Sequence, residues 1–412
     1  MNSINNSQKV ILNLVGSIWF LVSIDSFFVW GGLGTYLRII GTIGMMLFSF
    51  IIINKWRISA NNMISIFFLT VFLLWLLQYL SGMVILGRIF DFVPLLLLLL
   101  WPKEILNDWY KWLRKIIIFF AIGSSIVTIL SFIGVLEYIP HFTLSGRSQL
   151  HRSLGLEYNV YGVFVTVNSS AWAARACGPL QEPGHFAVIL GFFHLIDRFS
   201  HRKINFWIVL CGLLTFSLNF VLIFVFVEFH NFFIRQKIGK AIKSSIVLVG
   251  SIGLLFFILP QQTKDTIVYL FFERNIENVY EDYEATGSLT GALDARTGDY
   301  SLILYENIDN NSFLFGTGYY DSSSALSDYR GTILYIGLIG LLLSIIASIS
   351  ILQIKGYWRL KVSLFLSLFL IYLHRGWMMY YAYLYFLSYL AIAVEAAETS
   401  ILSSKKTENI IS

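Results

Sequence analysis

The chain has 412 residues, of which 57% are hydrophobic and only 13% are charged. A soluble globular domain carries roughly a quarter charged residues, so the composition excludes that class and predicts an integral membrane protein. The net charge of +5 is small for this length, and no nucleic-acid partner is expected.

Long apolar segments recur along the whole chain. A helix needs about 20 mainly apolar residues to cross a bilayer. By this measure the chain is expected to be an all-α polytopic membrane protein with about twelve spans, near residues 10–28, 36–54, 62–80, 84–101, 115–136, 184–198, 204–216, 218–234, 242–259, 329–353, 360–373 and 377–395. The first span has no small-residue cleavage site behind it, so we expect a retained helix rather than a signal peptide. The segment 204–234 is also a candidate for one broken helix.

Lysines and arginines gather in alternate connections between these spans. They lie at Lys55 and Arg57, at Lys103, Lys111, Arg114 and Lys115, at Arg198, Arg202 and Lys203, at Arg235, Lys237, Lys240 and Lys243, at Lys355, Arg359 and Lys361, and at Lys405 and Lys406. Short basic loops face the cytoplasm, so both termini are expected there too.

The two longest connections, 137–183 and 261–328, then face outward from a single membrane domain, 1–412. Loops longer than about 12–15 residues are usually functional or disordered. The chemistry is therefore expected in these two outer loops.

The first outer loop ends in a segment rich in Gly and Pro. The pairs Gly178-Pro179 and Pro183-Gly184 are typical of turns, and they would hold Arg175 and Glu182 beside a helix N-terminus. Such a terminus favours anions, and arginine binds phosphate oxygens in a bidentate manner. Two interpretations stay open: an anion site with a carboxylate beside it, and an ordinary loop-to-helix turn.

The second outer loop contains Arg296, then the turn Gly316-Thr317-Gly318, and leads into a span with Gly337-Leu338-Ile339-Gly340. Glycines allow a backbone to approach a ligand closely. A lone GxG is equally typical of a simple turn, so this segment is also left with two interpretations.

Several charged residues lie in or beside the expected spans. Arg88 and Asp91 are three residues apart, hence on one helix face and able to pair, with pairing and substrate contact equally open. Arg330 and Arg375 are expected to anchor outer span ends at the membrane interface. Asp25 and Glu228, which have no partner visible in the sequence, receive no assignment.

Together the two loop segments resemble the O-antigen and capsule repeat-unit polymerases (Wzy-like), a superfamily that also contains lipid-linked sugar ligases. The residues from Arg175 to Ala187 fit the pattern R-x-x-G-x-x-x-E-P-x-x-x-A. The later segment fits an arginine, an aromatic-containing helix, a hydrophobic-Phe-Gly-x-Gly turn and a span with G-L-I-G. The ligases carry a His-Asn pair before that span, whereas residues 326–329 read Leu-Ser-Asp-Tyr, which favours the polymerase.

This resemblance implies a GT-C-like membrane glycosyltransferase that joins undecaprenyl-diphosphate-linked oligosaccharides and releases the lipid diphosphate. It implies that Arg175 and Arg296 contact the diphosphate or the growing glycan, and that Glu182 acts as a base or orients an arginine. The other residues expected to bind substrate are Arg88, Arg147, Arg152, His185, Gly316, Gly318 and Tyr319.

Neither an Asp-x-Asp motif nor a His/Cys cluster indicates a divalent metal, so a metal-independent enzyme without a cofactor is expected. The implied location is the bacterial cytoplasmic membrane, and the implied partners are lipid-linked oligosaccharides, the lipid bilayer, a chain-length regulator and a flippase. A ligase is the second interpretation, and a flippase or other secondary transporter is the third. Transporters place charges near the bilayer midplane in broken helices, whereas the charges here concentrate in the outer loops.

Overall fold

The computed structural model describes residues 6–30, 33–51, 59–80, 83–145, 157–168, 175–201, 203–235, 261–268, 299–318, 328–352 and 357–411. Within these ranges the chain is mostly helical, as expected, and it also contains one small sheet. Its elements are α1 (Asn6–Ser23), η1 (Phe27–Val29), α2 (Leu33–Ile51), α3 (Ala60–Leu77), α4 (Met83–Leu98), α5 (Lys103–Phe132), η3 (Leu136–Tyr138), β1 (Phe142–Ser145), β2 (Glu157–Tyr161), β3 (Phe164–Asn168), α7 (Pro183–Ile196), η4 (Asp197–His201), α8 (Phe206–Leu214), α9 (Leu218–Arg235), α11 (Gln261–Val268), α14 (Asp299–Glu306), α15 (Asn310–Phe315), α16 (Tyr329–Leu352), α17 (Trp358–His374), η6 (Gly376–Tyr380) and α18 (Ala382–Ile411).

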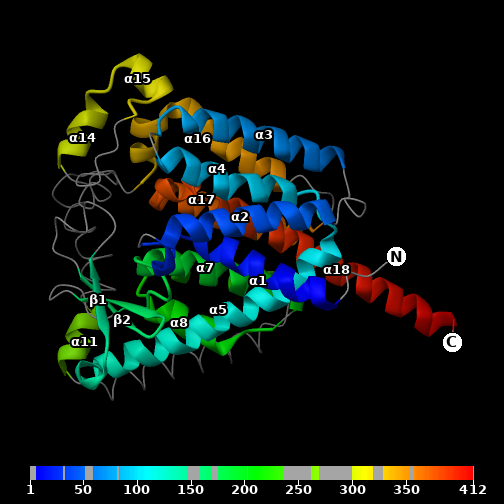
Figure 1. Cartoon of the computed structure of the whole chain (residues 1–412), viewed down its shortest axis with the longest axis horizontal. Helices are drawn as coiled ribbons and strands as arrows, with labels where there is room; N and C mark the ends of the chain where they lie inside the picture. The colour runs from blue at the N-terminus through cyan, green and yellow to red at the C-terminus, as the bar shows by residue number, and fades with distance from the viewer. Residues whose placement is uncertain are drawn as a thin grey trace.

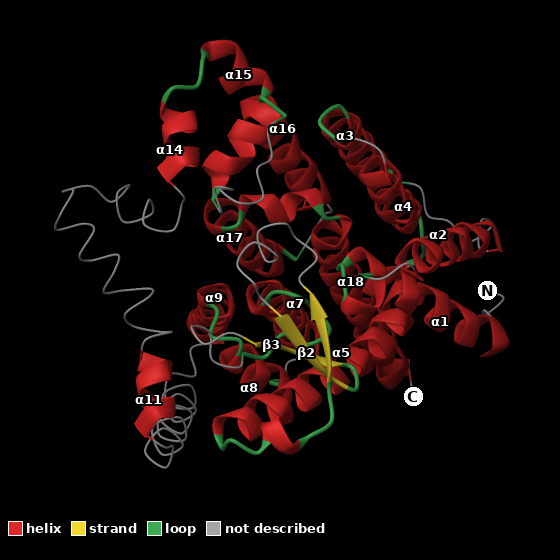
Figure 2. Ribbon diagram, turned by 60° about the vertical axis from the view of Figure 1, so that its left-hand side comes forward, coloured by secondary structure: helices red, strands yellow, loops and turns green. Residues whose placement is uncertain are grey.

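The long helices lie side by side in one bundle (Figure 1). Both chain ends lie at one end of this bundle, and the strands, α11 and α14 lie at the other, so the parts of the two large loops that the structure describes share an end. Figure 2 brings this end forward, with β3 beside α5, and with α14 and α15 next to α16. We call it the loop end.

Four helices in the described part of the chain are long and apolar enough to cross a membrane. Their apolar stretches are Gly34–Ile51, Ala60–Leu77, Lys103–Phe132 and Tyr329–Leu352. Shorter apolar helices cover Ser7–Ser23 and Leu218–Asn231. The structure thus has the composition of an all-α membrane protein. The expected span 242–259 lies outside the described residues.

The segment 204–234, a candidate for one broken helix, is divided into α8 and α9. Between them Phe216 takes the left-handed backbone conformation, with φ of 47°. Thr215 ends α8, and its hydroxyl donates to the carbonyl of Gly212 at 2.6 Å. A residue with a positive φ interrupts helical geometry, so the chain changes direction here.

Large aromatic side chains fill the centre of the bundle. Trp19 of α1, Trp109 of α5 and Phe386 of α18 are all buried, and both indole rings lie 5.2 Å from the Phe386 ring. Such edge and tilted contacts add to the burial of large apolar surface. Three helices that are distant in sequence are therefore held together at one point.

Helix α7 lies in the interior of the bundle. All of its residues are buried, and it packs against α8, α9 and α18. A helix that is apolar on every side belongs in the core of its protein, so the motif at its N-terminus has a rigid support.

A three-stranded antiparallel sheet, in the order β1-β2-β3, forms part of the first large loop. Gly162, with φ of 67°, turns β2 into β3. Tyr158, Val160 and Val165 form a small core with Cys177, onto which Phe27, Trp30 and Leu144 pack. The sheet was not expected from the sequence, and it ties the loop to the segment that follows α1.

Candidate functional site

The Gly- and Pro-rich motif before α7 is held in place by backbone hydrogen bonds. The N–H of Phe27 donates to the carbonyl of Pro179 at 2.7 Å, and the N–H of Val165 donates to Gly178 at 2.9 Å. Gly178 has φ of 62°, and the ring of Phe186 occupies the space that a Cβ atom would need. The turn expected at Gly178-Pro179 is therefore present, fixed between the sheet and η1.

Glu182 is the N-cap residue of α7, followed by Pro183 at the first helical position. Its carboxylate accepts a hydrogen bond from Arg375 of the α17–η6 junction, with 2.6 Å between Nη1 and Oε2. The Arg375 guanidinium lies against the backbone of Gly184, where any Cβ atom would collide with it. The structure thus brings the predicted carboxylate beside an arginine 193 residues away in sequence.

His185 lies directly behind this ion pair, in the first turn of α7. It is buried, and its ring lies 5.3 Å from Tyr381 and 5.0 Å from Tyr383. These tyrosines mark the start of α18. These aromatic contacts fix the imidazole where α7 and the start of α18 meet.

Arg88 and Asp91 form the ion pair that their spacing predicts, with 3.8 Å between Nη1 and Oδ2. Asp91 is also approached by Arg38 of α2, whose Nε lies 3.6 Å from Oδ1. Arg38 lies 3.5 Å from Asp25, which follows α1. These four side chains alternate in charge across α1, α2 and α4, and we call them the charged row. Arg88 lies 4.2 Å from the centre of the Tyr381 ring, which connects the row to His185.

Arg175 occupies a different place from Glu182. It is buried, and its guanidinium donates to the carbonyls of Thr215 at 2.8 Å and Phe216 at 2.9 Å. These carbonyls lie at the end of α8, where the last turn of a helix lacks intrahelical donors. Arg175 therefore stabilises the end of α8 in this structure.

The turn Gly316-Thr317-Gly318 packs against a break in α16. Gly337 has φ of 75° and ψ of 171° and interrupts the helix. The N–H groups of Thr317 and Gly318 donate to Leu334 and Tyr335 at 2.9 and 3.1 Å. A Cβ atom at Gly316 or Gly337 would collide with the backbone of the facing segment.

The indole of Trp75 donates to the carbonyl of Ile336 at 2.9 Å, which also serves this break. The two glycines expected at a substrate thus lie at a backbone-to-backbone contact between the second loop and α16.

Two arginines expected as interfacial anchors are each paired with a carboxylate. Arg330 is buried and pairs with Asp328, with 2.7 Å between Nη2 and Oδ2. Arg375 pairs with Glu182, as described above. The sequence shows only that these residues flank apolar spans. The carboxylates that pair with them are Asp328, just before α16, and Glu182, at the start of α7.

Four other expected substrate-binding residues, Arg147, Arg152, Arg296 and Tyr319, lie outside the described residues. Within the described ranges no group of three or more His, Cys, Asp or Glu side chains is arranged to hold a metal ion. Cys177 and Cys211 are buried, and neither forms a disulfide within the described residues.

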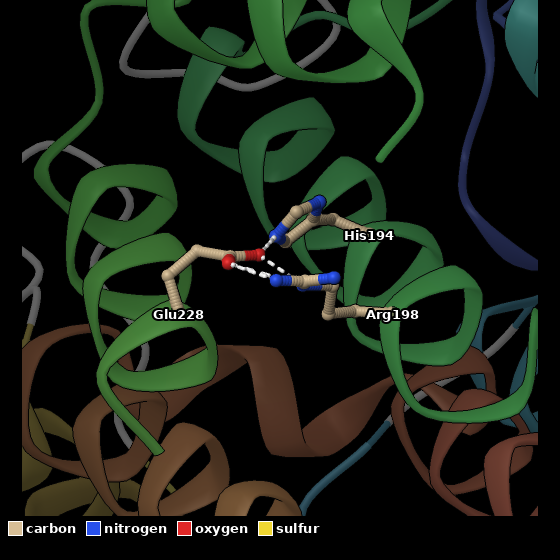
Figure 3. A network of polar contacts seen from close by, with 3 residues as sticks. All are labelled: His194, Arg198 and Glu228. Carbon is tan, nitrogen blue, oxygen red and sulfur yellow. Dashed lines mark hydrogen bonds and ion pairs between the residues drawn. The ribbon is translucent and has the colours of Figure 1, made fainter. Parts of the chain in front are cut away.

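A second polar network lies at the other end of α7 (Figure 3). Glu228 of α9 accepts from Arg198 at 2.8 to 3.0 Å and lies 3.1 Å from Nε2 of His194. Asp197, which is fully buried, accepts from Tyr110 and Arg114 of α5 at 2.8 and 2.6 Å. These pairs join α7 and the π-helical turn η4 to their neighbours. We interpret them as structural because they join buried helix ends and none of their residues belongs to the two loop motifs.

Sequence reasoning missed Arg38 and Tyr381 and gave no role to Asp25. The signal that could have found Arg38 and Asp25 is their position: each is a charge inside an expected span, and such charges usually face the protein interior. Their mutual contact crosses from α1 to α2 and leaves no periodic trace in the sequence.

No protein-family model, no curated protein and no solved structure matches this chain. Its own residues and their geometry therefore carry the functional argument.

Proposed function

We propose that this protein polymerises lipid-linked oligosaccharide repeat units in the bacterial cytoplasmic membrane, as a GT-C-like glycosyltransferase with about twelve spans. One observation carries the proposal. The motif carboxylate, Glu182, is paired with Arg375 at the rigid N-terminus of α7, at the junction with α18. A positioned carboxylate and a guanidinium are the two groups that the transfer reaction requires.

In the proposed reaction, Glu182 accepts the proton of an acceptor sugar hydroxyl. The hydroxyl oxygen forms a bond to the anomeric carbon of the donor glycan, and the bond from that carbon to the diphosphate oxygen breaks. The lipid diphosphate leaves with the electron pair, and Arg375 stabilises its negative charge through donors that suit phosphate oxygens.

Arg175 is a positioning residue in this scheme, since its guanidinium holds the end of α8. His185 supports the first turn of α7 through its contacts with Tyr381 and Tyr383. Undecaprenyl-diphosphate-linked oligosaccharides are the proposed substrates, with a chain-length regulator and a flippase as proposed partners.

The break in α16 at Gly337 favours a transporter at first sight, because transporter sites use broken helices whose freed carbonyls bind the cargo. Here the carbonyls of Leu334, Tyr335 and Ile336 are bonded to Thr317, Gly318 and Trp75. These carbonyls are occupied by protein donors, which supports the polymerase over the transporter.

The test is polymer production in a host strain deleted for the gene and complemented with wild type, Glu182→Gln or Arg375→Ala. The control is Arg359→Ala, which removes an exposed arginine at the start of α17. Glycans are resolved by size, and the membrane level of each variant is measured by immunoblot.

We expect the deletion and both site variants to leave single repeat units, and Arg359→Ala to give full-length polymer. Loss of one such charged donor corresponds to about a hundredfold in rate. Long polymer stranded on its lipid carrier in the deletion strain would instead identify a ligase. Unchanged polymer in the deletion strain would refute both activities.

A further inference from the structure

A cavity of about 280 Å³ opens beside the charged row, between the segment that follows α1, helices α2 and α4, and the residue before α18. Three charged side chains line it, Asp25, Arg38 and Arg88, together with Tyr381. Arg38 lies across α4 at Gly87, where a Cβ atom would meet its guanidinium. The absence of a side chain at Gly87 therefore allows this arginine to reach the cavity.

The hydrogen-bonding groups of this cavity are mixed. Arg38 and Arg88 supply only donors, Asp25 supplies only acceptors, and the Tyr381 hydroxyl supplies both. A diphosphate is an acceptor and needs donors alone. A sugar hydroxyl donates and accepts at once, so neighbouring donors and acceptors match it better.

The charge balance points in the same direction. Asp91 is buried behind the cavity, 3.6 Å from Arg38 and 3.8 Å from Arg88, and Asp25 lies 3.5 Å from Arg38. Two carboxylates thus offset two guanidinium groups. A multiply charged anion in the cavity would gain little net attraction and would be repelled by Asp25.

We propose that this cavity binds one uncharged sugar ring, and that it is a subsite for the acceptor glycan of the polymerase, for a sugar other than the one whose hydroxyl reacts at Glu182. The second part rests on the proposed function. Tyr381 contacts both His185 and Arg88, so this side chain connects the cavity to the first turn of α7, which Glu182 caps.

The size and the walls of the cavity suit such a ring. Its volume of about 280 Å³ gives room for one sugar ring. Its walls include Ile39, Val84 and Phe90, which offer apolar contact to the C–H faces of a ring. Few polar groups among apolar walls are typical of ligand sites.

The test measures protection of a reporter thiol in the purified full-length protein. Thr35 lines the cavity and is exposed, and both native cysteines are buried, so Thr35→Cys gives one reactive position. The probes are glucose, galactose and N-acetylglucosamine, with glucuronate as the anionic counterpart of glucose and inorganic pyrophosphate as the diphosphate. Maleimide labelling rates are measured with each probe.

We expect at least one neutral sugar to slow labelling, by about tenfold at ten times its dissociation constant, and pyrophosphate to have no effect. Adding Asp25→Asn removes one carboxylate while keeping the size of the side chain. Asparagine also tolerates the left-handed backbone that Asp25 adopts, with φ of 58°. Sugar binding should then weaken about tenfold, and pyrophosphate should begin to protect. The matched control is Asp108→Asn, which changes an exposed carboxylate of α5 that pairs with Lys9. It should change neither sugar binding nor the response to pyrophosphate.

Protection by pyrophosphate but by none of the neutral sugars in the Thr35→Cys protein would overturn the proposal, because the cavity would then be an anion site. Protection by no probe would overturn it as well. The assay reads binding alone, so its outcome is independent of the polymer assay that tests the proposed function.

Discussion

Exchanging the charges of Glu182 and Arg375 tests whether this ion pair is purely structural or takes part in the reaction. Their side chains are 33% and 21% exposed and 2.6 Å apart, so the interaction is partly screened. A hydrogen bond between charged groups contributes about 1.5–3 kcal/mol, and partial exposure favours the lower half of that range. Glu182→Gln or Arg375→Gln alone should therefore cost about 2 kcal/mol, a loss of a few degrees in melting temperature.

The double variant Glu182→Arg/Arg375→Glu restores opposite charges at the same two positions. It places a cation at the N-terminus of α7, which costs about 0.3–1 kcal/mol, so we expect stability within about 1 kcal/mol of wild type. Polymer formation should stay at the level of the deletion strain, because base and cation have exchanged places. The assay is thermal unfolding in detergent combined with glycan sizing. Wild-type polymer from the exchanged protein would refute the reasoning, because the pair would then be purely structural.

Four further predictions concern stability. Arg175→Ala should lower the free energy of unfolding by about 3 kcal/mol, since two carbonyls lose a charged donor, while polymer formed per folded molecule changes little; stability intact with polymer lost would contradict this. Gly337→Ala should cost at least about 2 kcal/mol because its backbone conformation is essentially limited to glycine, with faster proteolysis of the second loop as the measurement. Glu228→Gln should cost about 3 kcal/mol by leaving Arg198 without its carboxylate, with part recovered by adding Arg198→Gln in thermal unfolding. The hydroxyl and N–H of Ser312 donate to Asp309 and hold the pKa of this exposed carboxyl below its ordinary value. The N-cap of α15 is therefore fully formed at pH above that ordinary value and is lost as pH falls through the lowered pKa. Hydrogen exchange of residues 310–315, corrected for its intrinsic pH dependence, should detect the loss.

The sequence predicts a helix where an uninterrupted apolar run decides the structure. The span expected at 329–353 corresponds to α16, Tyr329–Leu352, because its side chains are apolar in every direction. The expected span at 115–136 covers only the later part of α5, which begins at Lys103 and ends at Phe132. The first turns of this helix bury Leu106, Trp109 and Leu113 on one face only, so a search for apolar runs passes over them. A search for helical period would have found them.

The candidate site was predictable only in part, for a related reason. Local chemistry identifies Glu182 as the residue before Pro183 at a helix start, and helix geometry pairs Arg88 with Asp91. The partner of Glu182 is 193 residues away, and no pattern within one span encodes it. The expected substrate contact of Arg175 stays untested, although its described partners are backbone carbonyls. The strands were missed because β2 and β3 are short and the spacing of apolar runs was matched to helices.

The burial of α7 has a consequence for how the chain is assembled. A ribosome completes α7 before it makes α9, the junction after α17, and α18, which supply its surroundings. In the growing chain His194 and Arg198 are therefore made before their partner Glu228, and Glu182 is made before its partner Arg375. The surroundings of α7 are therefore complete only after the C-terminal helix has been made. Shortening the chain from its C-terminus should consequently expose this helix to quality control, even when every residue of the motif is still present.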